Sequence, residues 1–126
     1  MGEAMIRDLG DRGMLGSHAV MHVPLSTLGP EELSTELLRS RAYLESLCGG
    51  DVEALSYPYG IADSVSRAVA DQAAAAGYQV AYTMERAHNT SLEDPCLLAR
   101  IDCRDIGGMN MLDDRSLYRT GRVRTG

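Results

Sequence analysis

The sequence of 126 residues contains no lysine, phenylalanine or tryptophan, and its twelve basic residues are all arginines. Without phenylalanine and tryptophan, the core must be built from leucine, valine, alanine, methionine and tyrosine. The formal net charge of −6 argues against sequence-independent nucleic-acid binding, which needs a basic face. No apolar run reaches the roughly 20 residues of a membrane-spanning helix, so no transmembrane segment is expected.

Two further observations bear on the cellular compartment. The first residues lack the basic-then-apolar order of a signal peptide, so a chain complete at Met1 is expected in the cytoplasm. Cys48, Cys96 and Cys103 stand at no spacing typical of a metal site. They are interpreted either as small buried thiols or, for Cys96 and Cys103, as a disulfide in an oxidising compartment.

Apolar residues at helical spacing, together with glycine stops, predict three helices, over residues 2–12, 30–48 and 64–76. Pro30 and the acidic residues after it suit the first turn of the second helix. Asp63 is expected to cap the third helix. The apolar face of that helix is expected to comprise Val65, Ala68, Val69, Ala73 and Ala76.

Short apolar runs between these helices predict four strands, over residues 14–18, 52–57, 78–83 and 97–102. Strands separated by helices indicate parallel βαβ units, and therefore an α/β fold. A single domain is expected over residues 1–112, followed by a polar tail over residues 113–126.

Two of the three histidines, His18 and His22, are four residues apart. Imidazole is the commonest protein ligand for zinc and similar ions, and this spacing lets two rings converge on one ion. On an ordinary helix face, such a pair is more often solvated or hydrogen-bonded. Here Pro24 forbids a long helix, and Gly16 indicates a short strand that ends at the pair. Loops after the carboxyl ends of strands are where α/β folds hold their sites, which favours a metal site.

Four sequence blocks follow one another in a characteristic order, namely Gly13–His22, Leu25–Leu33, Ser56–Gly60 and Ala76–Thr83. Together they resemble the polysaccharide deacetylase family, the NodB-homology domain of carbohydrate esterase family 4. The resemblance covers about residues 3–102 and implies a partial (β/α) barrel with parallel strands. It also implies metal-assisted removal of N-acetyl groups from N-acetylglucosamine polymers, such as chitin or peptidoglycan.

The resemblance assigns a metal role to the histidine pair. It implies that His18 and His22 bind a divalent cation, with zinc the first choice and cobalt or nickel as alternatives. The family's Thr-Phe-Asp-Asp-Gly block, which supplies a catalytic base and a third metal ligand, has no match here, nor has its late Leu-x-His block. Asp113-Asp114 lies out of order and His88 comes too early, so both are expected to be solvated.

The same resemblance assigns roles around the Tyr-Pro-Tyr-Gly block. It implies that the backbone N–H of Tyr59 helps to hold the oxyanion of the reaction, and that Tyr57, Pro58 and Tyr59 contact substrate. A plain β-turn is the alternative interpretation of this block. Arg100 is either a site residue or a partner in a surface salt bridge. We expect His18, His22, Tyr59 and Arg100 to gather at the carboxyl edge of the sheet.

Two functional hypotheses follow. In the first, the sequence is the carboxyl-terminal portion of a deacetylase of N-acetylated polysaccharide or oligosaccharide. In the second, the chain is complete and is a non-catalytic module that binds carbohydrate or metal. Four parallel strands with open edges make a poor free-standing domain, which favours the first hypothesis or a homo-oligomer that covers the edges.

Overall fold

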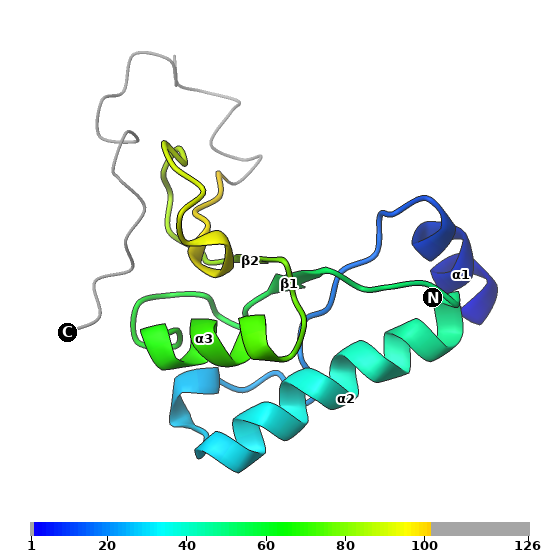
Figure 1. The fold of residues 1–126 in the computed structure, drawn as a ribbon, viewed down its shortest axis with the longest axis horizontal. Coiled ribbons are helices and arrows are strands. Elements are labelled where there is room, and N and C mark those ends of the chain that lie inside the picture. Colours follow the sequence, from blue (N-terminus) through cyan, green and yellow to red (C-terminus); the bar gives the residue numbers. More distant parts are fainter. Residues whose placement is uncertain (1, 102–126) are drawn as a thin grey trace.

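The structure is a computed structural model of the chain and describes residues 2–101. The expected tail over residues 113–126 and Cys103 lie outside the described residues, whereas Cys48 and Cys96 are buried. No helix of the described part is long and apolar enough to cross a membrane. The elements, in chain order, are α1 (Glu3–Asp11), a 3₁₀ turn (Leu25–Thr27), α2 (Pro30–Cys48), β1 (Ala54–Ser56), α3 (Arg67–Ala75), β2 (Val80–Tyr82) and a second 3₁₀ turn (Pro95–Leu97) (Figure 1).

The sheet is parallel, as expected, and its centre is the pair β1–β2, in which Leu55 lies opposite Ala81. Single parallel bridges extend the pair on both sides, Ser17 to Leu55 and Tyr82 to Leu98. The expected strands over residues 14–18 and 97–102 are therefore wrong in length, although their positions beside β1 and β2 are as the βαβ pattern requires.

A side chain occupies the edge of the Leu98 segment that faces away from β2. Asn89 Oδ1 accepts a hydrogen bond from Ala99 N at 2.9 Å, and Asn89 Nδ2 donates to Ala99 O at 2.8 Å. Because Leu98 N and O bond to the β2 segment, the Ala99 groups face the other way and are the ones that a further strand would use. After Leu98, the loop that follows β2 takes the place of a neighbouring strand.

Helices α1 and α2 lie where the sequence predicts them. The first turn of α2 carries Pro30, and the Glu32 carboxylate accepts a hydrogen bond from Gly29 N at 3.2 Å. The helix ends at Gly49, whose left-handed φ of 72° is typical of a glycine C-cap. Leu33 and Leu37 are buried on the face that packs on the core.

Helix α3 begins later than expected. Its N-cap is Ser66, whose Oγ accepts a hydrogen bond from Val69 N, and Asp63 does not cap it. Residues 61–65 form a turn instead, in which Val65 N donates to Ile61 O. The predicted apolar face is correct at Val65, Val69, Ala73 and Ala76, whereas Ala68 is exposed and Ala70 is buried in its place.

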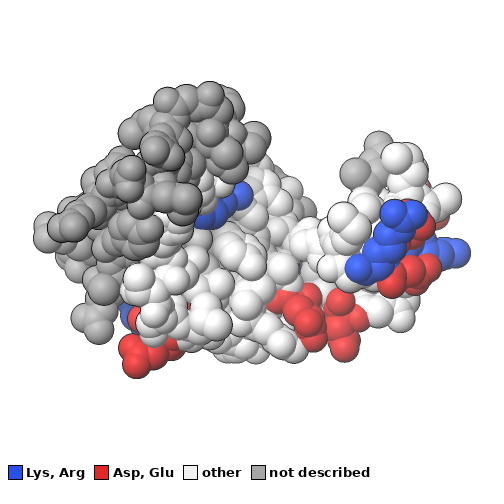
Figure 2. Space-filling model, turned by 90° about the horizontal axis from the view of Figure 1, so that it is seen from above, with Lys and Arg blue, Asp and Glu red and all other residues white. Residues whose placement is uncertain are grey.

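Helices α2 and α3 lie on one side of the two strands (Figure 1). The core between them is aliphatic, as the composition requires, with Tyr57 as its largest fully buried side chain. Helix α1 crosses the carboxyl-terminal end of α2, where Gly10 lies against Cys48. A β-carbon at position 10 would be 2.3 Å from the β-carbon of Cys48. The outer surface of α1 pairs charges of both signs, including Asp8 and Arg12 at 3.1 Å (Figure 2).

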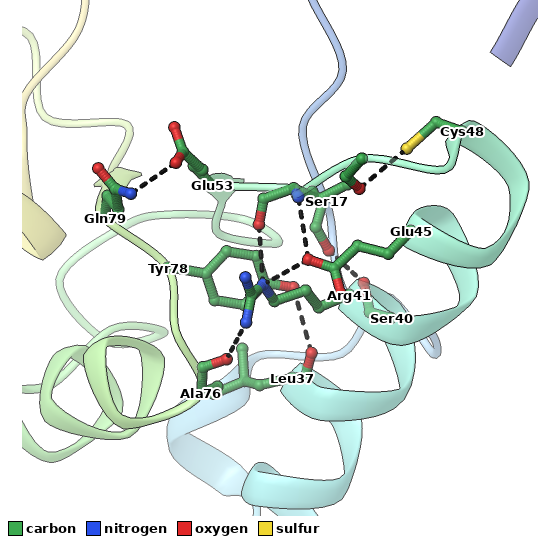
Figure 3. A network of polar contacts seen from close by, with 12 residues as sticks. Ser17, Leu37, Ser40, Arg41, Glu45, Cys48, Glu53, Ala76, Tyr78 and Gln79 are labelled. Atoms are coloured by element: carbon green, nitrogen blue, oxygen red, sulfur yellow. Dashed lines mark hydrogen bonds and ion pairs between the residues drawn. The ribbon is translucent and has the colours of Figure 1, made fainter. Parts of the chain in front are cut away.

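Arg41 of α2 ties the helix to both of its neighbours (Figure 3). Its guanidinium donates to Val52 O at 3.0 Å, ahead of β1, and to Ala76 O at 3.1 Å, at the end of α3. It also forms an ion pair with Glu45 at 3.0 Å. Gly77 passes directly over this guanidinium with a φ of 95°, so glycine is required there both for space and for backbone conformation.

Candidate active site

The four residues expected at the carboxyl edge of the sheet do lie there together. His18 follows the Ser17 bridge, Tyr59 follows β1 and Arg100 follows the Leu98 bridge. Ser56, the last residue of β1, links His18 to Arg100. Its carbonyl oxygen lies 2.6 Å from His18 Nδ1, and its Oγ accepts a hydrogen bond from Arg100 Nη1 at 3.2 Å. The architectural prediction is thus confirmed in position, and the chemical roles remain predictions.

The two imidazoles face one another across a short gap. Their ring centroids are 5.0 Å apart, and the ring planes are inclined by 58°. Because Ser56 O can only accept a hydrogen bond, His18 Nδ1 must carry the proton. The neutral ring then keeps its lone pair on Nε2, which is the arrangement of a metal-binding histidine whose other nitrogen is held by a carbonyl.

Backbone conformations favourable mainly to glycine gather in the same place. Among residues 2–101, the non-glycine residues with positive φ are Ala19 (61°), His22 (52°) and Tyr59 (62°). Holding a non-glycine residue in the left-handed region costs conformational energy, and such residues cluster at functional sites. Sequence reasoning missed this feature: alanine and tyrosine do not signal a left-handed backbone, and the enrichment of histidine there was not used for His22.

The Tyr-Pro-Tyr-Gly block is a tight turn that separates its two tyrosines. Tyr57 is fully buried and donates a hydrogen bond to Cys96 O at 2.8 Å, and burial raises the pKa of its hydroxyl. The expectation that the Tyr57 side chain contacts substrate is therefore wrong, because this side chain is enclosed in the core. Pro58 is buried as well, whereas Tyr59 is 52% exposed and its ring lies 5.1 Å from that of His22.

Short backbone hydrogen bonds close the turn around Tyr59. Gly60 N donates to Pro58 O, and Met84 N donates to Gly60 O, both at 2.7 Å. A β-carbon at position 60 would lie 2.8 Å from Met84 N, so this close approach of the two backbones requires glycine. Within residues 2–101, the Tyr59 N–H donates to no backbone or side-chain acceptor. An amide held in this way is available to an external oxyanion.

Arg100 has a position that suits the site. Its guanidinium contacts Ser56 Oγ and the sulfur of Met84, and its backbone N–H donates to Glu85 O at 2.9 Å. The ion pairs found within residues 2–101 involve other arginines, namely Arg12, Arg41 and Arg67.

The two imidazoles at this edge could supply part of the coordination shell of a metal ion. Two neutral imidazoles suit zinc, cobalt or nickel. In the described part of the chain, no group of three His, Cys, Asp or Glu side chains is placed to hold an ion.

His88 lies in the loop after β2, and its Nε2 is excluded from solvent, so its expected solvation is wrong. That loop folds back on the Leu98 segment, where Asn89 bonds to the backbone of Ala99.

Comparisons with known proteins agree with this architecture. The sequence profile of the family described as "Polysaccharide deacetylase" matches residues 2–81. The deacetylase PplD of Streptococcus pyogenes, solved in complex with acetate, is 22% identical with a TM-score of 0.71. BC0361, a polysaccharide deacetylase from Bacillus cereus, is 24% identical with a TM-score of 0.65.

Each alignment covers 80% of this chain, but 44% of the streptococcal protein and 32% of the Bacillus protein. The chain therefore spans less than half the length of either solved structure. No curated protein sequence matches it. The matched profile covers more than half of the chain and includes both histidines and the Tyr-Pro-Tyr-Gly turn, and the chain belongs to the polysaccharide deacetylase family.

Proposed function

We propose that this chain carries the metal- and substrate-binding half of a hydrolase that deacetylates N-acetylglucosamine-containing polysaccharide. The observation that carries the proposal is the histidine pair, whose rings face each other at 5.0 Å with His18 Nδ1 held by Ser56 O. This pair stands within the part of the chain that matches the deacetylase profile. A polar backbone amide and a guanidinium adjoin it at the same edge of the sheet.

Each residue at this edge of the sheet has a separate role in the proposed reaction. His18 and His22 would hold a divalent cation, with zinc the first choice and cobalt or nickel as alternatives. When bound, such a cation supplies Lewis acidity for an acyl oxygen. Water adds to the acetyl carbonyl, the C–N bond then breaks, and acetate and the free amine of the sugar leave.

The Tyr59 N–H donates to the oxygen that becomes negative as water adds, because this amide has no acceptor among residues 2–101. The exposed ring of Tyr59, beside His22, offers a flat apolar face to a sugar ring. Arg100 places positive charge next to Ser56, within the same edge. Each of these contributions comes from a side chain or amide of this chain.

A second candidate function is a non-catalytic module that binds carbohydrate or metal. The observation in its favour is that the described residues bring no third His, Cys, Asp or Glu to the histidine pair. Such a module would keep the ligand contacts of Tyr59 and the imidazoles but would lack a general base within reach of the attacking water.

Acetate release from N-acetylglucosamine oligomers, with zinc or cobalt added, tests the proposal. The chain alone is expected to be slow, because loss of a general base typically costs about 10²–10⁴-fold in rate. Whatever release occurs should disappear in His18→Ala and persist in His88→Asn, a histidine outside the pair. Oligomer binding without any histidine-dependent release would instead support the binding module.

A further inference from the structure

The segment that carries both histidines has little structure of its own. Only Ser17 pairs with the sheet, and the backbone then turns through left-handed conformations at Ala19 and His22. The side chains of Val20 and Met21, between the histidines, are 46% and 68% exposed. Apolar packing of this loop comes from Ala19, which is only partly buried against the core, so polar contacts must hold the rest of it.

The first of these contacts comes from Glu36 of α2. One carboxylate oxygen, Oε2, accepts hydrogen bonds from Val20 N at 3.0 Å and from Met21 N at 2.9 Å. Hydrogen bonds from amides to a carboxylate are about twice as strong as those between neutral groups. Both amides belong to the residues between His18 and His22, so one side chain constrains the backbone that connects the two rings.

A second contact from the same face of α2 holds the start of the loop. Ser40 lies one helical turn after Glu36, and its Oγ is hydrogen-bonded to the Oγ of Ser17. Both serines are buried, and Ser17 N donates to Ala54 O at 2.8 Å. The position of His18 is thus bracketed, with Ser17 fixed before it and the Glu36 carboxylate fixed after it.

We propose that Glu36 is a positioning residue that holds the imidazoles of His18 and His22 in their facing arrangement. The inference rests on the proposed function in so far as that arrangement serves a metal. The hydrogen bonds of the carboxylate go to backbone amides, and none of the ion pairs found within residues 2–101 involves it. Glu36 acts on the rings through the hydrogen bonds that it accepts from the amides of Val20 and Met21.

The test compares Glu36→Ala and Glu36→Gln with the wild-type chain of 126 residues. Glu31→Ala on the same helix is the matched control, because Glu31 is exposed near the amino end of α2. Alanine is a strong helix former, so α2 is expected to survive the substitution. Glutamine keeps one acceptor oxygen at the same reach, and it serves as the conservative variant should the alanine variant unfold.

Two readouts are measured. In metal-free protein, amide hydrogen exchange and chemical shifts of Val20 and Met21 report the hydrogen bonds to Glu36. In the second, cobalt is titrated by calorimetry and by its absorption spectrum. Loss of a residue that orients metal ligands typically lowers affinity about 10–100-fold. We expect a loss of this size and faster amide exchange in Glu36→Ala, with partial recovery in Glu36→Gln and no change in Glu31→Ala.

The two proposals fail in different ways. A wild-type chain that binds no cobalt would count against the proposed function, and the amide readout would still decide the role of Glu36. Unchanged amide exchange and shifts at Val20 and Met21 in Glu36→Ala would overturn the positioning role. So would cobalt affinity equal to that of Glu31→Ala in a wild-type background that binds the ion.

Discussion

His18 Nδ1 lies 2.6 Å from the carbonyl oxygen of Ser56, the last residue of β1. This one contact fixes the tautomer of the imidazole and joins the histidine loop to the central strand of the sheet. It also gives the Nε2 lone pair of His18 a fixed direction at the edge of the sheet.

The first prediction concerns zinc binding. The wild-type chain should bind zinc weakly, since two imidazoles in residues 2–101 leave most of the coordination shell to other ligands. The double variant His18→Ala/His22→Ala should lose this binding by at least about 10-fold, as expected for removal of direct ligands. Isothermal calorimetry provides the measurement, with His88→Asn as control. Equal affinity in the double variant and the wild type would show that zinc binds elsewhere.

The second prediction concerns Gly77. Alanine at this position would be held at a φ of 95° with its β-carbon 2.2 Å from Arg41 Nη1. The strain and the displaced guanidinium should lower the free energy of unfolding by about 1–3 kcal/mol. Urea titration followed by circular dichroism measures the change. Gly50→Ala is the control, because no atom lies within 4 Å of a β-carbon there. Similar stability of the two variants would contradict the close approach of Arg41.

The third prediction concerns the start of α3. Ser66→Ala removes the N-cap acceptor of Val69 N and should cost about 1 kcal/mol of stability. Asp63→Ala, at the position that the sequence predicts as the cap, should change stability by less than about 0.5 kcal/mol. Thermal unfolding of the two variants side by side distinguishes these caps, and a reversed order of stability would restore Asp63 as the cap.

The fourth prediction concerns high pH. Burial raises the pKa of Tyr57 above its ordinary value of 10.0, so the folded state keeps the phenol protonated where the unfolded state ionises. The resulting stability is complete below pH 10 and declines as the pH rises beyond it. Tyr57→Phe should flatten this decline, while costing about 1 kcal/mol at neutral pH through the lost bond to Cys96 O.

Alkaline unfolding monitored by circular dichroism tests this expectation. Tyr43→Phe is the matched control, because the Tyr43 side chain is 63% exposed. Its removal should leave both the neutral stability and the alkaline profile nearly unchanged. A Tyr57→Phe profile as steep as that of the wild type would mean that other groups govern the alkaline transition. Tyr78, whose pKa burial also raises, would be the next candidate.

Local signals were sufficient to predict the long helix and the placement of the histidines. Pro30 and Gly49 mark both ends of α2, and the βαβ pattern puts residues after each strand at one edge of the sheet. Such signals depend on neighbouring residues alone. They required no knowledge of which distant segments meet.

The features that escaped prediction depend on contacts between distant segments. Asn89 takes the Ala99 backbone groups that a further strand would use, and a periodicity argument contains no such information. The burial of Tyr57 depends on Cys96 being close to it, and the role of Glu36 depends on where the histidine loop passes. Each of these contacts joins residues that are far apart in the sequence.

Ser56 contacts His18 across 38 positions of the chain and Arg100 across 44. Both contacts require the central strand to be aligned with a segment from each direction along the chain. Contacts of such large sequence separation carry a high loop-closure cost and tend to form late in folding. The facing arrangement of His18 and His22 is therefore expected to form only after the parallel array has aligned, so the metal binding proposed for this pair would report completed folding.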